Sequence, residues 1–191
     1  MKTIIANFKS NKNSQEAKEW VDVFSKEFPA DSPHTVVLCP PAVHLPIFQT
    51  LTTNPSIKLG LQDISSFPAG AYTGAIGTKN VEDMSVEYVI VGHSERRQYF
   101  HETSQDVANK IREALQAQIR PIKNNNKNEI HAQAAAIENE YRNKVIVAFE
   151  PVEHIGTGVS DTLPDILTAF AEIKDAFGSV HSIYGGSVSS H

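Results

Sequence analysis

The segment Tyr88-Val-Ile-Val-Gly-His-Ser-Glu-Arg-Arg97 decides the fold of this chain. Its first four residues are apolar without alternation, and polar, chemically active side chains follow at once. Strands that are buried on both faces have this pattern, which is typical of a parallel sheet covered by helices. The segment Val145-Ile-Val-Ala-Phe-Glu150 repeats the arrangement and ends in a carboxylate. The sequence therefore predicts buried parallel strands that carry functional groups at their ends.

The rest of the chain alternates short β-branched runs with amphipathic helical patterns. Helices are predicted at Ser14–Phe28, Ser104–Gln118 and Leu163–Phe177, where apolar residues recur at three- and four-residue steps. The predicted strands are Thr3–Phe8, Thr35–Cys39, Ile57–Leu61, Tyr88–Gly92, Ile119–Ile122, Val145–Phe149 and Ser182–Tyr184. This alternation predicts βαβ units and an α/β protein with a parallel sheet.

Two architectures are compatible with such units, an open doubly wound sheet and a closed (β/α) barrel. A dinucleotide-binding open sheet would show Gly-x-Gly-x-x-Gly after its first strand, whereas this chain continues there with Asn7-Phe-Lys-Ser-Asn11. We therefore predict a (β/α)8 barrel that forms a single domain over residues 1–191.

The predicted barrel is incomplete in two places. No signal for an eighth strand occurs before His191, so we expect the domain to be C-terminally incomplete relative to an eight-stranded barrel. The polar run Lys123-Asn-Asn-Asn-Lys-Asn-Glu129 follows the fifth strand signal. We predict that this run cannot form a barrel strand, that it is a solvated loop, and that the fifth strand region is eroded.

Composition argues against several classes of protein. The formal net charge of −5 argues against a nucleic-acid partner. The single cysteine, Cys39, cannot form an internal disulfide and is predicted to be a buried strand residue of a cytoplasmic protein. The sequence lacks a signal peptide and the run of about 20 apolar residues that a membrane helix needs. It also lacks a Cys/His cluster or an acidic metal-binding loop, so we expect that no metal is required.

Chemically active side chains follow four of the predicted strands. In barrel enzymes the reacting groups lie at the carboxyl ends of the strands. The candidates are Asn7 and Lys9 after the first strand, His93, Ser94 and Glu95 after the fourth, Glu150 after the sixth, and Gly185, Gly186 and Ser187 after the seventh. Each alone has a structural explanation, such as a hydrogen-bonded histidine, a solvated lysine or a capping carboxylate, but a barrel would bring them to one mouth.

Together these groups suit one kind of chemistry. A carboxylate can abstract a proton next to a carbonyl while an imidazole and an ammonium group stabilise the oxyanion that develops. Glycine-rich turns can present backbone N–H groups to a phosphate. The residues therefore predict a proton-transfer enzyme that acts on a small phosphorylated carbonyl compound.

The same residues carry a resemblance to the triose-phosphate isomerase family, whose fold is the TIM barrel. Asn7-Phe-Lys9 is similar to the family's Asn-Trp-Lys, and the segments Val91–Arg97, Phe149–Val152 and Ile155–Gly158 match its fourth-strand, sixth-strand and lid motifs. Tyr184-Gly-Gly-Ser-Val188 matches the seventh loop, and Gly70-Ala-Tyr-Thr-Gly74 resembles the loop that forms the family's dimer.

The resemblance implies an activity and a set of roles. The reaction would interconvert dihydroxyacetone phosphate and glyceraldehyde 3-phosphate in glycolysis and gluconeogenesis. Its catalytic residues would be Glu150 as the base, His93 as a neutral electrophile, and Lys9. Lys9, helped by Asn7, would bind the substrate and neutralise its negative charge.

The resemblance also implies how the substrate is held and how the chain associates. Gly156 and Ser187 would offer backbone N–H groups to the phosphate, and Pro151 to Gly158 would form a lid. Glu95 would support the site from behind, and a homodimer would form through the loop around Tyr72-Thr73.

Two alternatives stay open at this point. One is a truncated, catalytically impaired isomerase-like barrel that acts as a binding or structural protein. The other is a different barrel enzyme that acts on a phosphorylated sugar.

Overall fold

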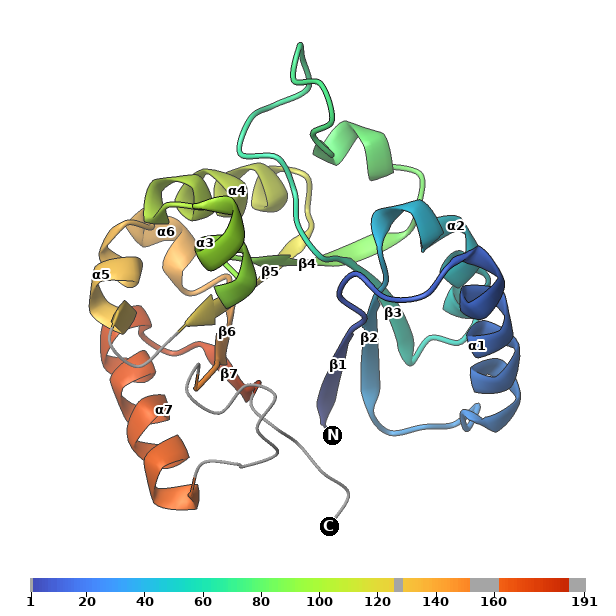
Figure 1. The fold of residues 1–191 in the computed structure, drawn as a ribbon. Coiled ribbons are helices and arrows are strands. Elements are labelled where there is room, and N and C mark those ends of the chain that lie inside the picture. The colour runs from blue at the N-terminus through green and yellow to red at the C-terminus, as the bar shows by residue number, and fades with distance from the viewer. Residues whose placement is uncertain (1, 126–128, 152–161, 186–191) are drawn as a thin grey trace. The chain divides into compact units, whose positions relative to one another are not determined.

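The computed structural model describes residues 2–125, 129–151 and 162–185 (Figure 1). The chain divides into two compact units. The first comprises Met1–Ile90 with Ala117–Ile119, and the second comprises Val91–Gln116 with Arg120–His191.

The first unit contains parallel strands in the order β1-β2-β3-β4. Its elements in chain order are β1 (Thr3–Asn7), α1 (Ser14–Glu27), β2 (Thr35–Cys39), η1 (Ala42–His44), α2 (Leu45–Phe48), η2 (Gln49–Thr53), β3 (Ile57–Leu61), η3 (Thr78–Val81) and β4 (Val86–Val91), whose last residue opens the second unit. The registers pair Thr3 with Thr35, Val36 with Ile57, and Leu61 with Val89.

Helix α1 begins at a capping box. The Asn13 side chain accepts hydrogen bonds from the backbone N–H groups of Gln15 and Glu16, and the Glu16 carboxylate accepts from the Asn13 N–H. These reciprocal bonds satisfy donors that a helix start otherwise leaves without partners. The buried side of α1 carries Trp20, whose ring stacks on Phe48 of α2.

Strands β2 and β3 approach closely at a glycine. A Cβ on Gly60 would lie 2.5 Å from the Cys39 Sγ, a separation that side chains do not tolerate. Cys39 is fully buried, and burial raises the pKa of its thiol to about 12. The prediction that Cys39 is a buried strand residue is confirmed, because it lies in β2 and is inaccessible to solvent. A thiol with so high a pKa is also not a nucleophile at neutral pH.

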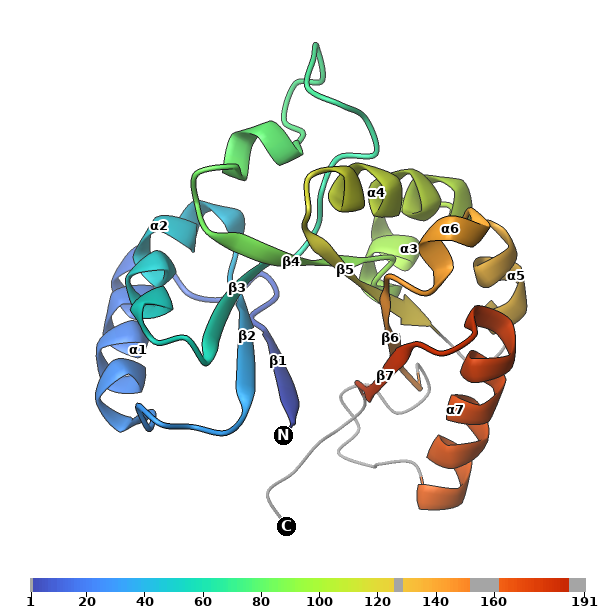
Figure 2. The ribbon, with the colours of Figure 1, turned by 180° about the vertical axis from the view of Figure 1, so that it is seen from behind.

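The second unit contains parallel strands in the order β5-β6-β7. Its elements in chain order are α3 (Ser94–Phe100), α4 (Ser104–Gln116), β5 (Arg120–Asn125), α5 (Ile130–Ala135), α6 (Asn139–Arg142), β6 (Ile146–Phe149), α7 (Leu163–Phe177) and β7 (His181–Tyr184). Helix α4 packs on β5, α7 packs on β6 and β7, and α5 packs on α7, as the view from behind also shows (Figure 2).

The prediction that the run from Lys123 cannot form a strand is wrong for Lys123–Asn125. Strand β5 continues through Asn125, and these residues pair with Val147, Ala148 and Phe149 of β6. The strand can include the buried lysine because its ammonium group finds partners inside the unit. The Lys123 Nζ donates to the Asn124 carbonyl, the Asn125 Oδ1 and the Gln133 Oε1. Buried polar groups with partners do not carry the cost of groups left without them.

The other predicted strands agree with the structure to within two residues at each end, and the helix predicted at Leu163–Phe177 has those bounds. The helix predicted to end at Gln118 ends at Gln116. The short helices α2, α3, α5 and α6 were not predicted, because four to seven residues give too little periodicity. Among the described helices, none combines the length and the apolar character that crossing a bilayer requires.

Candidate active site

The turn after β4 holds the first functional side chain. Gly92 has a φ of +67°, and a Cβ there would lie 3.0 Å from the Val107 Cγ2 of α4. This left-handed turn aims the chain into α3, with His93 as the N-cap residue. The His93 Nδ1 accepts a hydrogen bond of 3.2 Å from the Glu95 backbone N–H. The start of α3 therefore fixes the orientation of the imidazole.

The hydrogen bond at Nδ1 also fixes the tautomer of His93. Because Nδ1 accepts, the ring proton of the neutral imidazole lies on Nε2. The His93 Nε2 lies 3.2 Å from the Glu150 Oε1, and both side chains are nearly buried. The imidazole is therefore placed to donate a hydrogen bond while uncharged.

Glu150 directly follows β6, and its backbone N–H donates to the Asn125 carbonyl at 2.8 Å. Its Oε2 accepts a hydrogen bond of 3.2 Å from the Ser94 Oγ. Burial raises the pKa of the Glu150 carboxyl, but hydrogen bonds from His93, Asn124 and Ser94 outweigh it and lower that pKa below its ordinary value. The site therefore holds an ionised carboxylate at neutral pH.

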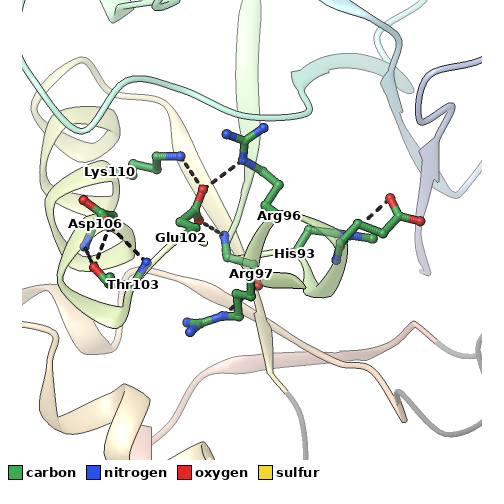
Figure 3. Close-up of polar contacts among 9 residues, drawn as sticks. His93, Arg96, Arg97, Glu102, Thr103, Asp106 and Lys110 are labelled. Atoms are coloured by element: carbon green, nitrogen blue, oxygen red, sulfur yellow. Dashed lines mark hydrogen bonds and ion pairs between the residues drawn. The ribbon is translucent and has the colours of Figure 1, made fainter. Parts of the chain in front are cut away.

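The buried carboxylate of Glu102, between α3 and α4, stabilises the turn that carries His93 (Figure 3). The Glu102 Oε1 accepts from the Gly92 N–H at 3.1 Å. Its Oε2 accepts from the Arg96 Nε at 2.8 Å and from the Lys110 Nζ. Sequence reasoning missed Glu102, because only the folded chain shows that it reaches the backbone ten residues earlier.

The end of β7 approaches Glu150 through a glycine. A Cβ on Gly185 would lie 3.2 Å from the Glu150 Cγ, and the Gly185 N–H donates to the Phe149 carbonyl at 2.8 Å. In the structure this N–H therefore continues the pairing between strands rather than facing a phosphate. A glycine at this position leaves room for the Glu150 side chain.

The first unit holds the other two predicted residues. The Asn7 Oδ1 accepts a hydrogen bond of 3.0 Å from the Lys9 backbone N–H, and Lys9 has a φ of +50°. The Gln62 Nε2 donates to the Lys9 carbonyl at 3.0 Å and to the Cys39 carbonyl at 2.8 Å. Asn7 and Gln62 therefore hold the backbone turn that carries the lysine.

The structure thus brings His93, Ser94, Glu95 and Glu150 together in the second unit and Asn7 and Lys9 together in the first. Gly156, Gly186, Ser187 and the lid from residue 152 lie outside the described residues. Within the described ranges, no group of three or more histidine, cysteine or acidic side chains is arranged to hold a metal ion.

A carboxylate paired with a neutral imidazole, placed where parallel strands of a β/α protein end, defines a class of enzymes that move a proton at a carbon next to a carbonyl. The comparisons with known proteins place the chain within that class. The family model described as triosephosphate isomerase matches residues 2–191, and the chain belongs to this family.

Individual relatives agree with the family match. A triosephosphate isomerase from Clostridium botulinum (strain Loch Maree / Type A3) is 34% identical over 209 residues, which cover 97% of this chain and 84% of the relative. One from Alkaliphilus oremlandii is 34% identical over 212 residues, covering 98% and 85%. One from Aquifex aeolicus is 31% identical over 207 residues, covering 97% and 84%.

These matches confirm the predicted fold class and the predicted activity, isomerisation of a triose phosphate. The chain spans about 84% of the length of the Clostridium botulinum relative. In the described residues, seven strands of the family's barrel are present.

Proposed function

We propose that Glu150 is the base and His93 the electrophile of the isomerase reaction. The observation that supports this assignment is the 3.2 Å approach of the His93 Nε2 to the Glu150 Oε1. A proton donor and a proton acceptor at this separation can act on adjacent carbon and oxygen atoms of one small substrate. The two groups come from the ends of different strands, as barrel chemistry requires.

The reaction follows from these two groups. The Glu150 carboxylate takes a proton from the carbon next to the carbonyl, and the electron pair of that C–H bond moves toward the carbonyl oxygen. The Nε2–H of His93 donates to the oxygen as negative charge develops, which stabilises the enediolate. The proton of the adjacent hydroxyl group passes to the former carbonyl oxygen through His93, and Glu150 returns its own proton to the former carbonyl carbon, so that the new carbonyl forms at the neighbouring carbon. Before it takes the first proton, Glu150 must exchange its contacts with His93 and Ser94 for contacts with the substrate.

The remaining roles concern substrate binding. The Lys9 ammonium group neutralises negative charge on the substrate, and Asn7 supports it through the hydrogen bond to the Lys9 N–H. Gly156 and Ser187 supply backbone N–H groups to the phosphate, and Pro151 to Gly158 form the lid over it. The reaction needs neither a metal nor another cofactor, because the carboxylate and the imidazole supply the proton chemistry.

The experiment that tests the assignment is Glu150→Gln. We expect kcat to fall roughly 10²- to 10⁴-fold, because an amide cannot accept the carbon-bound proton. Glu140→Gln, at an exposed position of α6, is the matched control and should keep wild-type turnover. Full activity of Glu150→Gln in a coupled assay with glyceraldehyde 3-phosphate would show that the base is a different residue.

We further propose a cytoplasmic homodimer that works in glycolysis and gluconeogenesis, without a nucleic-acid or membrane partner. The loop that contains Tyr72-Thr73 would form the dimer contact. The Tyr72 ring stacks on Phe67 with centroids 4.7 Å apart, and the two side chains are 44% and 48% exposed. Two stacked, exposed rings offer apolar area that a partner surface can cover. The alternative of an impaired, non-catalytic barrel is not favoured, because His93 and Glu150 are arranged for catalysis.

A further inference from the structure

The polar end of β5 is the feature that the isomerase assignment leaves unexplained. Lys123, Asn124 and Asn125 are nearly fully buried, in a strand where apolar side chains would be cheaper to bury. Successive side chains of a strand point to opposite faces, so Asn124 lies on one face and its two neighbours lie on the other. The two faces of β5 therefore serve different purposes.

One face meets the helices. The Lys123 Nζ donates to the Asn125 Oδ1 and the Gln133 Oε1, and it lies 5.7 Å from the centroid of the Phe177 ring. These contacts join Lys123 and the Asn125 Oδ1 in a polar network between β5, α5 and α7, while the buried Asn125 Nδ2 has no hydrogen-bond partner among the described residues. They leave Asn124 without a role on this face.

The other face meets the catalytic carboxylate. Asn124 pairs with Ala148 in the strand register, and the Asn125 carbonyl accepts the Glu150 N–H at 2.8 Å. The backbone of β5 is thus fixed beside Glu150. Asn124 and Glu150 line one small cavity of about 10 Å³ together with Ser94, Asn125 and Gln133, and a hydrogen bond from the Asn124 side chain is one cause of the lowered pKa of the Glu150 carboxyl.

We propose that Asn124 is a positioning residue for Glu150, whose amide Nδ2 donates a hydrogen bond to the carboxylate. This inference rests on the proposed role of Glu150 as the base. An ionised carboxylate only accepts hydrogen bonds, so the amide must act as the donor. With Ser94 on Oε2 and His93 at Oε1, Asn124 becomes another donor that orients the carboxylate before the substrate arrives.

The hydrogen bond has a chemical consequence. Because donors stabilise the charged form, Asn124 contributes to the lowered pKa of Glu150 and keeps the base ionised at lower pH. The other charged or titratable groups near the carboxylate are His93 and, lining the same cavity from α3, Arg97. Lys123 of β5 lies on the opposite face, and β7 contributes the uncharged Gly185. Asn125 of β5 also meets Glu150, through its backbone carbonyl, which accepts the Glu150 N–H, and through the cavity that both residues line.

The test compares Asn124→Ala and Asn124→Asp with the wild-type protein over a range of pH. In Asn124→Ala the acidic limb of the kcat/KM profile should move to higher pH, with a roughly tenfold loss of kcat and little change of KM. Asn124→Asp keeps the side-chain volume but places a second carboxylate beside Glu150, so its acidic limb should move further in the same direction. Asn143→Ala, at an exposed asparagine, is the matched control and should leave the profile unchanged.

The outcomes separate this inference from the assignment of the base. If Asn124→Ala fails to fold, as circular dichroism would show, the near-isosteric Asn124→Asp decides the question alone. An acidic limb that stays in place in a folded Asn124 variant would overturn the inference, even if Glu150→Gln abolishes turnover. If Glu150→Gln instead keeps full activity, the assignment of the base is wrong, whatever the Asn124 variants do.

Discussion

At the scale of single residues, the site depends on backbone conformations that few amino acids adopt. Gly92 has a φ of +67° and lies directly before His93, while its N–H donates to the Glu102 carboxylate at 3.1 Å. The direction of the imidazole is therefore set by a glycine turn and by a buried acid that clamps it. The orientation of the His93 ring and the local stability at Gly92 are therefore linked through the same peptide.

The substitution Gly92→Ala should lower the stability of the protein and also disturb the orientation of His93. The left-handed conformation costs an alanine about 1–2 kcal/mol, and the new Cβ would press on Val107 at 3.0 Å. We expect the free energy of unfolding, measured in urea, to fall by about 2–4 kcal/mol in total. We also expect kcat to fall, because His93 moves with the turn. Gly77→Ala, where φ is −86°, is the control. A Gly92→Ala protein with wild-type stability would contradict the strain that we ascribe to this turn.

At the scale of elements, β5 shows why sequence patterns fail at polar strands. The apolar runs of β2, β4 and β6 predicted those strands because burial on both faces leaves a continuous signal. Strand β5 lacks that signal, because it ends in the polar residues Lys123–Asn125. The partner that allows Lys123 to be buried, Gln133, lies in another element and cannot be predicted from the sequence of the strand. The same limit hid Glu102 and Asn124, whose contacts join segments that the sequence separates. His93 and Glu150 could be predicted because each stands at the end of an apolar strand.

The buried lysine of β5 should make stability depend on pH. Burial, together with the nearby charge of Arg97, holds the pKa of Lys123 well below its usual range. The unfolded chain keeps the ordinary lysine pKa, so between the two values it binds more protons than the folded protein. The free energy of unfolding therefore rises with pH between the lowered pKa of Lys123 in the folded protein and the ordinary lysine pKa.

Lys123→Met should flatten this dependence. The variant removes the proton that the unfolded state takes up, so its free energy of unfolding should rise less steeply with pH than that of the wild type. Urea unfolding at a series of pH values up to the ordinary lysine range measures the two slopes. Lys18→Met, on the exposed side of α1, should keep the wild-type slope. Equal slopes for Lys123→Met and wild type would mean that Lys123 is charged in the folded protein.

At the scale of the whole molecule, the proposed homodimer would form through the Tyr72 loop. We expect Tyr72→Asp to weaken the homodimer, because a carboxylate would be placed in an apolar contact and the ring stacked on Phe67 would be lost. Sedimentation or light scattering over a range of protein concentrations measures the shift toward monomer. Tyr99→Asp, at an exposed tyrosine of α3, is the control. A wild-type monomer at all concentrations would refute the proposed dimer.

The packing of Cys39 against Gly60 makes the cysteine thiol a natural probe of local unfolding between β2 and β3. The chain has one cysteine, and its Sγ lies fully buried between β2 and β3. A thiol reagent can modify it only in molecules whose strands have separated, since the reaction needs an accessible thiolate. The labelling rate therefore measures how often the first unit opens locally and exposes the thiol. Ligands or substitutions that suppress this opening would slow the labelling, so one natural side chain can monitor local unfolding without any engineered probe.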